Sequence, residues 1–471
     1  MNEPEAMKLR ANEPLQSGNT SEPGAPALRQ TLGSPSIVFM VLAAAAPLTA
    51  AAGVLPLSFL FSDNFAAPVY FVVATVLMLL FAVGYTALSK YVPNAGAFYA
   101  YIAAGLGRIP GNAAAMLALG AYSLTGLALA VYAGPGASDL GATFTPWADS
   151  PWWLWSIVAA ALLALLGYRN IDLSSRVLAV LLILEGAVMV ILATVIFISG
   201  GKEGFAAAAL NPVQSFAHGS PASGIMWAVL CFVGFEATAV FRGEARNPGR
   251  TIPRATYGAA LAIGLLYTFV ATAIVTGAGT ADVLALVAAD PAGVLFALAD
   301  EYIGPWFSAV INALLLGSIF AGALSFHNVV TRYQLSMGSS GLLPAFVGRV
   351  HGTHRVPSNA SLVLSIVTLV AIVAAAVLNL APVLQVFGPL IGILGFAVLA
   401  MMAFASISAI VYFGRSRQPR PGILVRLIAP VLASLGLLWV LVMSLTDRKF
   451  NRMRPSMARV LGLETRSAKE G

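Results

Sequence analysis

Long apolar runs separated by short polar segments make up residues 36–446 of the chain. A run of roughly 17–25 apolar residues is long enough to cross the hydrocarbon core of a bilayer as a helix. The pattern predicts eleven such helices. Their ranges are 36–61, 67–89, 111–134, 151–168, 177–199, 222–241, 256–278, 302–331, 359–380, 383–413 and 425–445. The segment 281–301 is less apolar and carries four acids, so we expect it to lie in an external loop.

Composition excludes a soluble fold. The chain is 59% hydrophobic and 10% charged, whereas soluble proteins have about 25% charged residues. Seventeen of the 45 charges lie in residues 1–35 and 447–471. We expect a disordered cytoplasmic tail over 1–35 and a basic polar tail over 447–471. The chain between them must use lipid as its solvent.

The distribution of basic residues predicts the orientation. Of the 16 basic residues between the tails, 15 fall in alternate loops, and Lys202 is the exception. Under the positive-inside rule that side is cytoplasmic, and the N-terminus shares it. The same rule explains the net charge of +7, so no nucleic-acid partner is predicted. The expected location is the plasma membrane, with a multi-pass topology.

The C-terminal tail does not fit this pattern, because eleven crossings place seven of its basic residues outside. Three interpretations remain open. The last run does not cross, or the charge is tolerated outside, or a twelfth helix has been lost. We favour the loss of a twelfth helix.

Two runs contain residues that interrupt a helix. The first holds APLTAAAG (46–53), in which Pro47 removes a backbone donor and Gly53 lowers the cost of unwinding. The sixth holds CFVGFEA (231–237), with Gly234 in mid-span and Glu236 after it. Unpaired backbone groups cannot face lipid, but they can line a polar cavity. The alternative is a proline kink filled by packing.

Interruptions in the first and sixth runs are typical of a five-plus-five inverted repeat with a midplane site. Half-helix N-termini there attract an anionic group, and free carbonyls attract an amine or a cation. An amino acid carries both ends. The predicted fold is an all-α polytopic membrane protein with a ten-helix core over 36–413, whose repeats are 36–199 and 222–413. Residues 414–446 add a further transmembrane helix.

Three stretches resemble the amino acid–polyamine–organocation (APC) superfamily of transporters. They are YTALSKYVPNAGAFYAYIAAGLGRIPG (85–111), GFEATAVFRGEARNPGRTIPRA (234–255) and FHNVVTRYQLSMGSSGLLPAFVGRVHGTHRVPSNA (326–360). The resemblance covers about residues 36–445. It implies a leucine-transporter-type fold, a substrate that is an amino acid or related amine, and coupling to protons or exchange.

The resemblance also implies a set of site residues. The implied substrate-binding residues are Pro47, Thr49, Ala50, Ala51, Gly53, Tyr122, Cys231, Phe232, Gly234, Phe235 and Glu236. Phe232 and Phe235 would be gates or walls over the substrate. For each aromatic residue, packing within the bundle is the alternative.

Some features depart from the family. Ser339-Ser340-Gly341 replaces a basic–acidic–glycine triplet, and APLTAAAG replaces a glycine-dense signature. We expect that the family's twelfth helix has been lost.

Two acids lie deep in spans, Glu185 and Glu236. A central charge costs about 2.5–3.5 kcal/mol on insertion scales, so each acid needs a partner or a proton. A carboxyl group buried among apolar side chains can exchange a proton near neutral pH. Glu236 is our first candidate for proton coupling and Glu185 the second. For Glu236, a structural hydrogen bond to freed N–H groups is the alternative, and for Glu185 a polar packing role.

Sodium coupling stays open, because hydroxyl groups of Thr49, Ser318 or Ser325 are suitable ligands. His327 is expected to form a hydrogen bond and not to titrate. The cluster Arg242, Glu244, Arg246, Arg250 and Arg254 either fixes topology, which we favour, or closes an inner gate. No cofactor or metal site is predicted, and a homodimer stays open.

These observations predict a secondary active transporter that works by alternating access. A channel needs a continuous polar lining, whereas these spans are apolar with isolated interruptions. A sensor that kept the fold without flux remains an alternative. An enzyme is not expected, because no nucleophile–base pair, metal cluster or phosphate loop occurs in the sequence.

Overall fold

The computed structural model describes most of the predicted membrane core. Its described residues are 45–92, 97–144, 150–168, 175–236, 247–339, 341–348, 358–415 and 421–447, together with Ile37 and Thr238. The predicted tail over 1–35 and residues 448–471 lie outside this part, as do Arg242, Glu244, Arg246 and Ser340. The described part is helical and contains no strand.

Eleven apolar helical runs occupy the described part, one for each predicted run. Eight helices are long and apolar enough to cross a membrane, and three apolar runs are shorter. In chain order the runs are α3 with α4 (Pro47–Gly53, Leu55–Ser62), α5 (Pro68–Leu88), α7 (Arg108–Phe144), α8 (Trp152–Tyr168), α9 (Ser175–Ser199), α11 (Pro221–Leu230), α12 (Pro248–Ala278), α15 (Pro305–Ser339), α16 (Ser358–Val377), η3 with α17 (Pro382–Phe387, Gly388–Arg415) and η4 with α18 (Leu424–Ile428, Ala429–Thr446). The all-α polytopic membrane fold is confirmed.

Shorter elements connect these runs. They are α6 (Ala97–Leu106), η1 (Ala207–Leu210), α10 (Pro212–Ala217), α13 (Val283–Ala289) and α14 (Val294–Tyr302). The segment 281–301 thus holds two short helices and no span, as its acids predict.

Prolines set where many of these helices begin. A proline at the first helical position loses nothing, because that N–H has no intrahelical partner, and its fixed φ suits the helix. Helices α3, α5, α10, α11, α12 and α15 start in this way, at Pro47, Pro68, Pro212, Pro221, Pro248 and Pro305. At these six positions, proline therefore starts a helix and does not break it.

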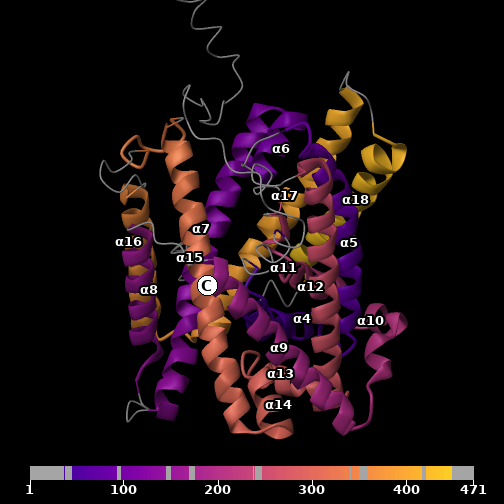
Figure 1. Cartoon of the computed structure of the whole chain (residues 1–471), viewed down its shortest axis with the longest axis vertical. Coiled ribbons are helices and arrows are strands. Elements are labelled where there is room, and N and C mark those ends of the chain that lie inside the picture. Colours follow the sequence, from indigo (N-terminus) through magenta and orange to yellow (C-terminus); the bar gives the residue numbers. More distant parts are fainter. Residues whose placement is uncertain are drawn as a thin grey trace, which may run out of the picture.

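The bundle has two ends (Figure 1). One end holds α10, α13 and α14 and is called the α13 end; the other holds α6 and is called the α6 end. Among the described side chains, Lys202, Glu203, Asp282 and Asp290 lie at the α13 end, where Lys202 pairs with Asp282 at 3.7 Å. The described basic side chains at the α6 end are Lys90, Arg108, Arg250, Arg254, Arg332, Arg415 and Arg426. This separation of charge follows the loop pattern in the sequence.

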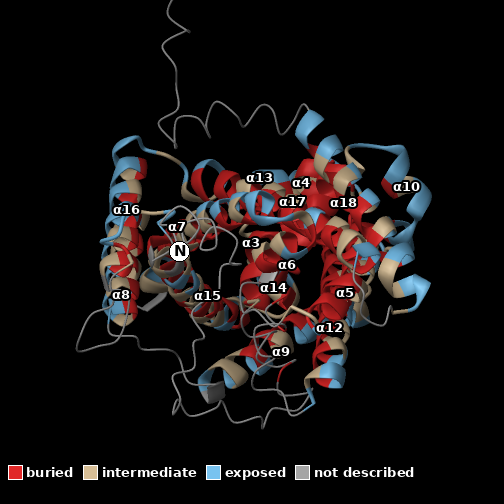
Figure 2. Ribbon diagram, turned by 90° about the horizontal axis from the view of Figure 1, so that it is seen from above, coloured by how far each residue is buried: buried red, intermediate tan, exposed pale blue. Residues whose placement is uncertain are grey.

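Burial separates a central bundle from its edge. Figure 2 shows buried residues along the inward faces and exposed ones on outlying segments such as α10 and α16. The apolar part of Pro382–Arg415 is 72% buried, against 33% for Asn359–Val377. Exposed side chains on α16, such as Leu362 and Val370, are apolar and fit contact with lipid.

The last helix runs the length of its neighbour α5. Pro430, at the start of α18, lies against Gly84 near the end of α5, and Gly436 lies against Leu77. At the far end of α18, Asp447 accepts a hydrogen bond from Ser223, in the first turn of α11. Residue 447 therefore lies at the α13 end, opposite Arg415 and Arg426. This path argues against the interpretation in which the last run does not cross.

Candidate functional site

The interruption of the first run lies just before the predicted residues. Ala46 has φ 46° and ψ 67°, a left-handed conformation that is uncommon for alanine. The implied unwinding over Pro47–Gly53 is wrong, because these seven residues form α3 and are buried. Proline is favourable at the first helical position and alanine is the best helix former. The irregular backbone is therefore at Ala45 and Ala46.

The interruption of the sixth run lies where the sequence predicts it. Helix α11 ends at Leu230, residues 231–234 form turns, and a short 3₁₀ segment follows at Phe235 and Glu236. Gly234 has φ 111°, a conformation that side chains rarely adopt. The glycine is thus required by the turn itself.

The two interruptions touch each other. A Cβ atom on Gly234 would lie 3.1 Å from the Cα atom of Ala45 and 3.3 Å from its nitrogen. A side chain at position 234 would therefore push the two irregular segments apart. The inverted-repeat geometry predicted this meeting of the first and sixth runs.

Glu185, in the middle of α9, caps the first turn of α3. Its Oε2 atom accepts hydrogen bonds from the backbone N–H of Leu48 at 3.0 Å and from the hydroxyl of Ser318 at 2.9 Å. The Ser318 hydroxyl also accepts from the N–H of Thr49, at 3.4 Å. Glu185 is 2% exposed. The donors freed at the start of a helix are thus satisfied by α9 and α15.

Glu236 plays the same part at the other interruption. Its Oε2 atom accepts a 2.8 Å hydrogen bond from the N–H of Gly234, and its carbonyl accepts one of 2.9 Å from the hydroxyl of Tyr85. Its side chain is buried, and the described residues offer neither glutamate a salt bridge. Each interruption therefore holds a buried carboxyl group on a freed backbone N–H.

Aromatic residues close the site towards the α6 end. Phe235 packs edge-on against Phe81 at 5.9 Å, and Phe81 lies 5.1 Å from Tyr85. Tyr85 in turn contacts Tyr101 at 5.0 Å. Phe232 is fully buried as well. Phe235 thus belongs to an aromatic cluster between the interruption and the α6 end.

A single aromatic pair covers α3 towards the α13 end. Tyr132 of α7 and Phe387 of η3 stack with centroids 4.4 Å apart. A Cβ atom on Gly53 would lie 2.9 Å from the Tyr132 ring and 3.0 Å from that of Phe387. Sequence reasoning missed both aromatic residues. Gly53, which the two rings cover, is among the implied substrate-binding residues. Its close approach to both rings explains why this position lacks a side chain.

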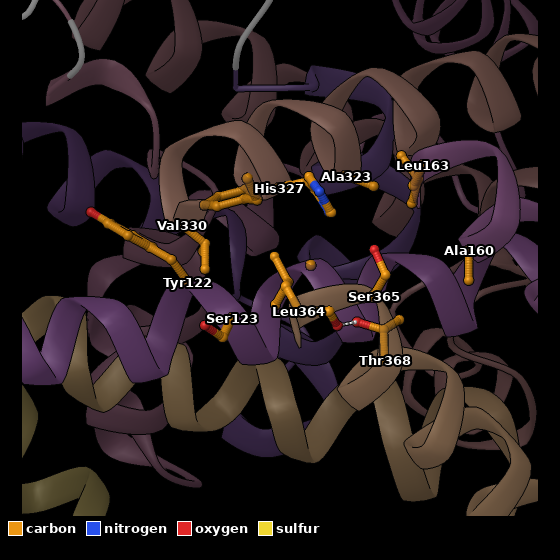
Figure 3. Close-up of a pocket in the computed structure, with 12 residues that line it drawn as sticks. Tyr122, Ser123, Ala160, Leu163, Ala323, His327, Val330, Leu364, Ser365 and Thr368 are labelled. Carbon is orange, nitrogen blue, oxygen red and sulfur yellow. Dashed lines mark hydrogen bonds between the residues drawn. The ribbon is translucent and has the colours of Figure 1, made fainter. Parts of the chain in front are cut away.

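Two further predicted residues make packing contacts, Cys231 in the sixth-run turn and Tyr122 in α7. The Cys231 thiol is buried and donates to the carbonyl of Trp227 at 3.6 Å. Tyr122 contacts Phe326 and Tyr333, and it lines a cavity of about 20 Å³ between α7, α8, α15 and α16. Figure 3 shows this cavity with Ser123, His327 and Ser365 around it. The lining contains no residue of either interruption.

The other polar candidates form ordinary contacts. His327 shares a 2.8 Å hydrogen bond with Ser361 of α16, which agrees with its expected structural role. The Ser325 hydroxyl donates to the carbonyl of Ala321 in its own helix. The Thr49 hydroxyl is buried and has no hydrogen-bond partner among the described residues. Of the three suggested sodium ligands, Ser318 is held by Glu185 and Ser325 by its own helix.

Comparison with known proteins identifies the family. The model of the amino acid permease family matches residues 63–454. The chain is 26% identical over 309 residues to a branched-chain amino acid permease of Bacillus subtilis, which covers 61% of this chain and 63% of that protein. It is 30% identical over 148 residues to a branched-chain amino acid permease of Lactococcus lactis, covering 31% of this chain and 30% of that protein.

A third relative carries no assigned substrate. It is an uncharacterized transporter of Mycobacterium tuberculosis, 31% identical over 202 residues, with 42% of this chain and 41% of the relative covered. The matches thus span less than two thirds of these relatives' own lengths. The family match covers most of this chain, and it agrees with the eleven apolar runs and with the interruptions in the first and sixth. The chain belongs to the amino acid permease family, whose members in the APC superfamily are multi-pass membrane transporters.

Proposed function

We propose that this protein is a secondary active transporter that moves an amino acid or related amine across the plasma membrane by alternating access. One observation carries the proposal. The interrupted first and sixth runs touch at Ala45 and Gly234, and each holds a buried glutamate on a freed backbone N–H. Irregular backbone at membrane depth needs a cavity or a polar partner. Here the two carboxyl groups are the polar partners, one at each interruption.

The aromatic layers on either side supply the two closures. The Tyr132–Phe387 pair lies towards the α13 end, and the cluster of Phe81, Tyr85 and Phe235 lies towards the α6 end. Alternating access requires that one layer opens while the other stays closed. Both layers are packed in this structure, which fits an occluded arrangement.

Helices α4 and α11 are joined firmly enough to move as one unit. The Ser58 hydroxyl donates to the carbonyl of Gly224 at 2.8 Å, and the N–H of Ser220 donates to the carbonyl of Ser62 at 2.7 Å. Phe61 also stacks on Trp227 at 5.1 Å. These contacts tie the α13-end halves of the first and sixth runs together. We assign the motion to this unit, with the touching interruptions as its hinge.

Protons are the coupling ion that this site suits best. Two buried carboxyl groups without a described cation each need a proton or a bound positive charge. The donors around Glu185 Oε2 are an N–H and a hydroxyl, which occupy that oxygen and leave a metal cation only the other one, while the Ser318 and Ser325 hydroxyls already donate elsewhere. We therefore assign Glu236 and Glu185 to proton coupling or proton-linked exchange, in preference to sodium.

The side assignment follows from charge. The α6 end carries the basic residues and is cytoplasmic under the positive-inside rule. The N-terminus then lies inside, and α10, α13 and α14 face outwards. The names of two relatives direct the first substrate tests to branched-chain amino acids.

Uptake into proteoliposomes tests the proposal. Saturable flux of an amino acid or amine should respond to an imposed pH gradient, and Glu236→Gln should abolish that response. Glu203→Gln is the matched control, because this exposed acid of the α13 end binds only Thr280 among the described residues. Binding without flux would identify a sensor, and single-channel conductance would identify a channel. Either result would overturn the proposal.

A further inference from the structure

The backbone N–H donors that a ligand carboxylate would use are already occupied in this site. At the first interruption Pro47 has no N–H, and the N–H groups of Leu48 and Thr49 go to Glu185 and Ser318. At the sixth, the N–H of Gly234 goes to Glu236. Side chains of the protein thus accept the hydrogen bonds that these backbone amides would otherwise donate to a bound anion.

The groups that remain unpaired around these donors are mainly hydrogen-bond acceptors. A carboxylate has two oxygens and about four lone-pair sites. Both described donors to Glu185 reach Oε2, and Oε1 receives none from the described residues. The buried Thr49 hydroxyl also lacks a partner there. No described cation balances the two acids.

The remaining surroundings are mostly apolar and close, and the Tyr267 hydroxyl donates to the carbonyl of Pro47 at 3.3 Å. A Cβ atom on Gly322 would lie 3.4 Å from the Cβ of Ala46 and 3.5 Å from a methyl group of Leu129. Phe232, in the turn of the sixth run, is fully buried. An ammonium group has three donors and a positive charge, so it satisfies the free acceptors and the charge, whereas a carboxylate adds negative charge and could accept only from the Thr49 hydroxyl among these groups.

We propose, resting on the transport function above, that the site recognises the ammonium end of its substrate and does not recognise the carboxylate end. The ligand class is a primary amine with an apolar side chain. It includes amino acids whose carboxylate is masked as an amide. Glu185 holds the ammonium through its free oxygen, and it occupies the donors that would otherwise bind the carboxylate.

Ligands that differ at one end only distinguish recognition of the ammonium group from recognition of the carboxylate. The purified full-length protein is titrated with L-leucine, L-leucinamide and N-acetyl-L-leucine, and the melting temperature and calorimetric affinity are measured. Leucinamide is expected to bind within about threefold of leucine or more tightly, and N-acetyl-leucine about a hundredfold more weakly or not at all. Leucinamide at least tenfold weaker than leucine would overturn the inference.

A variant assigns the effect to Glu185. Glu185→Gln keeps the shape and removes the charge, and it should weaken leucinamide at least tenfold, while Glu203→Gln leaves the affinity unchanged. Unchanged affinity in Glu185→Gln would overturn the role of this residue. If the variant does not fold, the comparison of the three ligands on the unmodified protein still decides. Should none of the twenty amino acids or their amides bind, the proposed function fails together with the inference, whereas binding of the free acids alone contradicts only the inference.

Discussion

The Glu185 carboxylate accepts a 3.0 Å hydrogen bond from the backbone N–H of Leu48, which lies 137 positions earlier in the chain. Through the Ser318 hydroxyl the same oxygen is also tied to α15. One buried carboxyl group therefore joins three helices at the interruption of the first run. A change in its charge acts on the start of α3 directly, and not through a distant relay.

Removal of the Ser318 hydroxyl should lower the free energy of unfolding. Ser318→Ala leaves the N–H of Thr49 without its acceptor and takes one donor from Glu185. A buried group left unsatisfied costs about 1–3 kcal/mol, so the free energy of unfolding should fall by that amount. Ser325→Ala is the matched control two turns away, because its hydroxyl binds only within its own helix among the described residues. Thermal unfolding in detergent measures both, and equal losses would contradict the role of Ser318.

Gly234 should tolerate no side chain. Gly234→Ala combines a left-handed backbone, which costs roughly 1–2 kcal/mol for alanine, with a contact of 3.1 Å to the Cα of Ala45. Gly341→Ala separates these effects, since Gly341 has φ 78° and nothing within 4 Å of its Cβ position. We expect Gly234→Ala to lose more stability than Gly341→Ala and to lose uptake. Similar unfolding temperatures for the two variants would show that the interruptions do not press on each other.

The contrast between Gly234 and Pro47 shows what the sequence can predict. A glycine in the middle of an apolar run either allows close helix packing, as Gly84 and Gly436 do, or permits a turn, and at Gly234 the turn is where the pattern predicts it. Proline has two opposite roles, since it breaks a helix from inside and begins one at its first position. The sequence does not say which role Pro47 plays, because the left-handed residue that decides it is an ordinary alanine, Ala46.

The partners across the bundle were beyond sequence reasoning. Glu185 stands out because acids are rare in spans, but its contact with Leu48 depends on how α9 packs against α3. Tyr132 and Phe387 lie in different halves of the core, and aromatic residues occur in most of the apolar runs. Their pairing requires the fold, and so does the π-helical turn that carries Phe387.

The C-terminal tail should lie on the side opposite the N-terminus. Helix α18 runs antiparallel to α5, with Pro430 against Gly84 and Gly436 against Leu77, and it ends beside Ser223. A reporter enzyme fused after residue 471 should therefore be active on the external side. A fusion in the segment 416–420, between α17 and η4, is the control and should report the cytoplasm. Cytoplasmic activity at both positions would mean that the last helix does not cross in the cell.

The Tyr132–Phe387 pair should control access from the α13 end. Phe387 is the last residue of a π-helical turn, a geometry frequent at functional sites, and its ring covers Gly53 together with Tyr132. The Tyr132 hydroxyl is buried and has no partner among the described residues, so stacking holds the pair. Phe387→Ala removes that stacking, which is worth about 0.5–1.5 kcal/mol beyond area burial, and should favour the open state by up to about tenfold.

The chain supplies its own reporter for this opening. Cys231 is its only cysteine, and it is buried at the sixth-run interruption. A membrane-impermeant thiol reagent added at the α13 end should modify Cys231 several-fold faster in Phe387→Ala, with no change from the α6 end. Phe269→Ala is the matched control, because it removes a similar ring contact, with Phe197 at 5.1 Å, on a partly exposed face. Equal acceleration in both variants would reflect general loosening and would exclude a specific gate at Phe387.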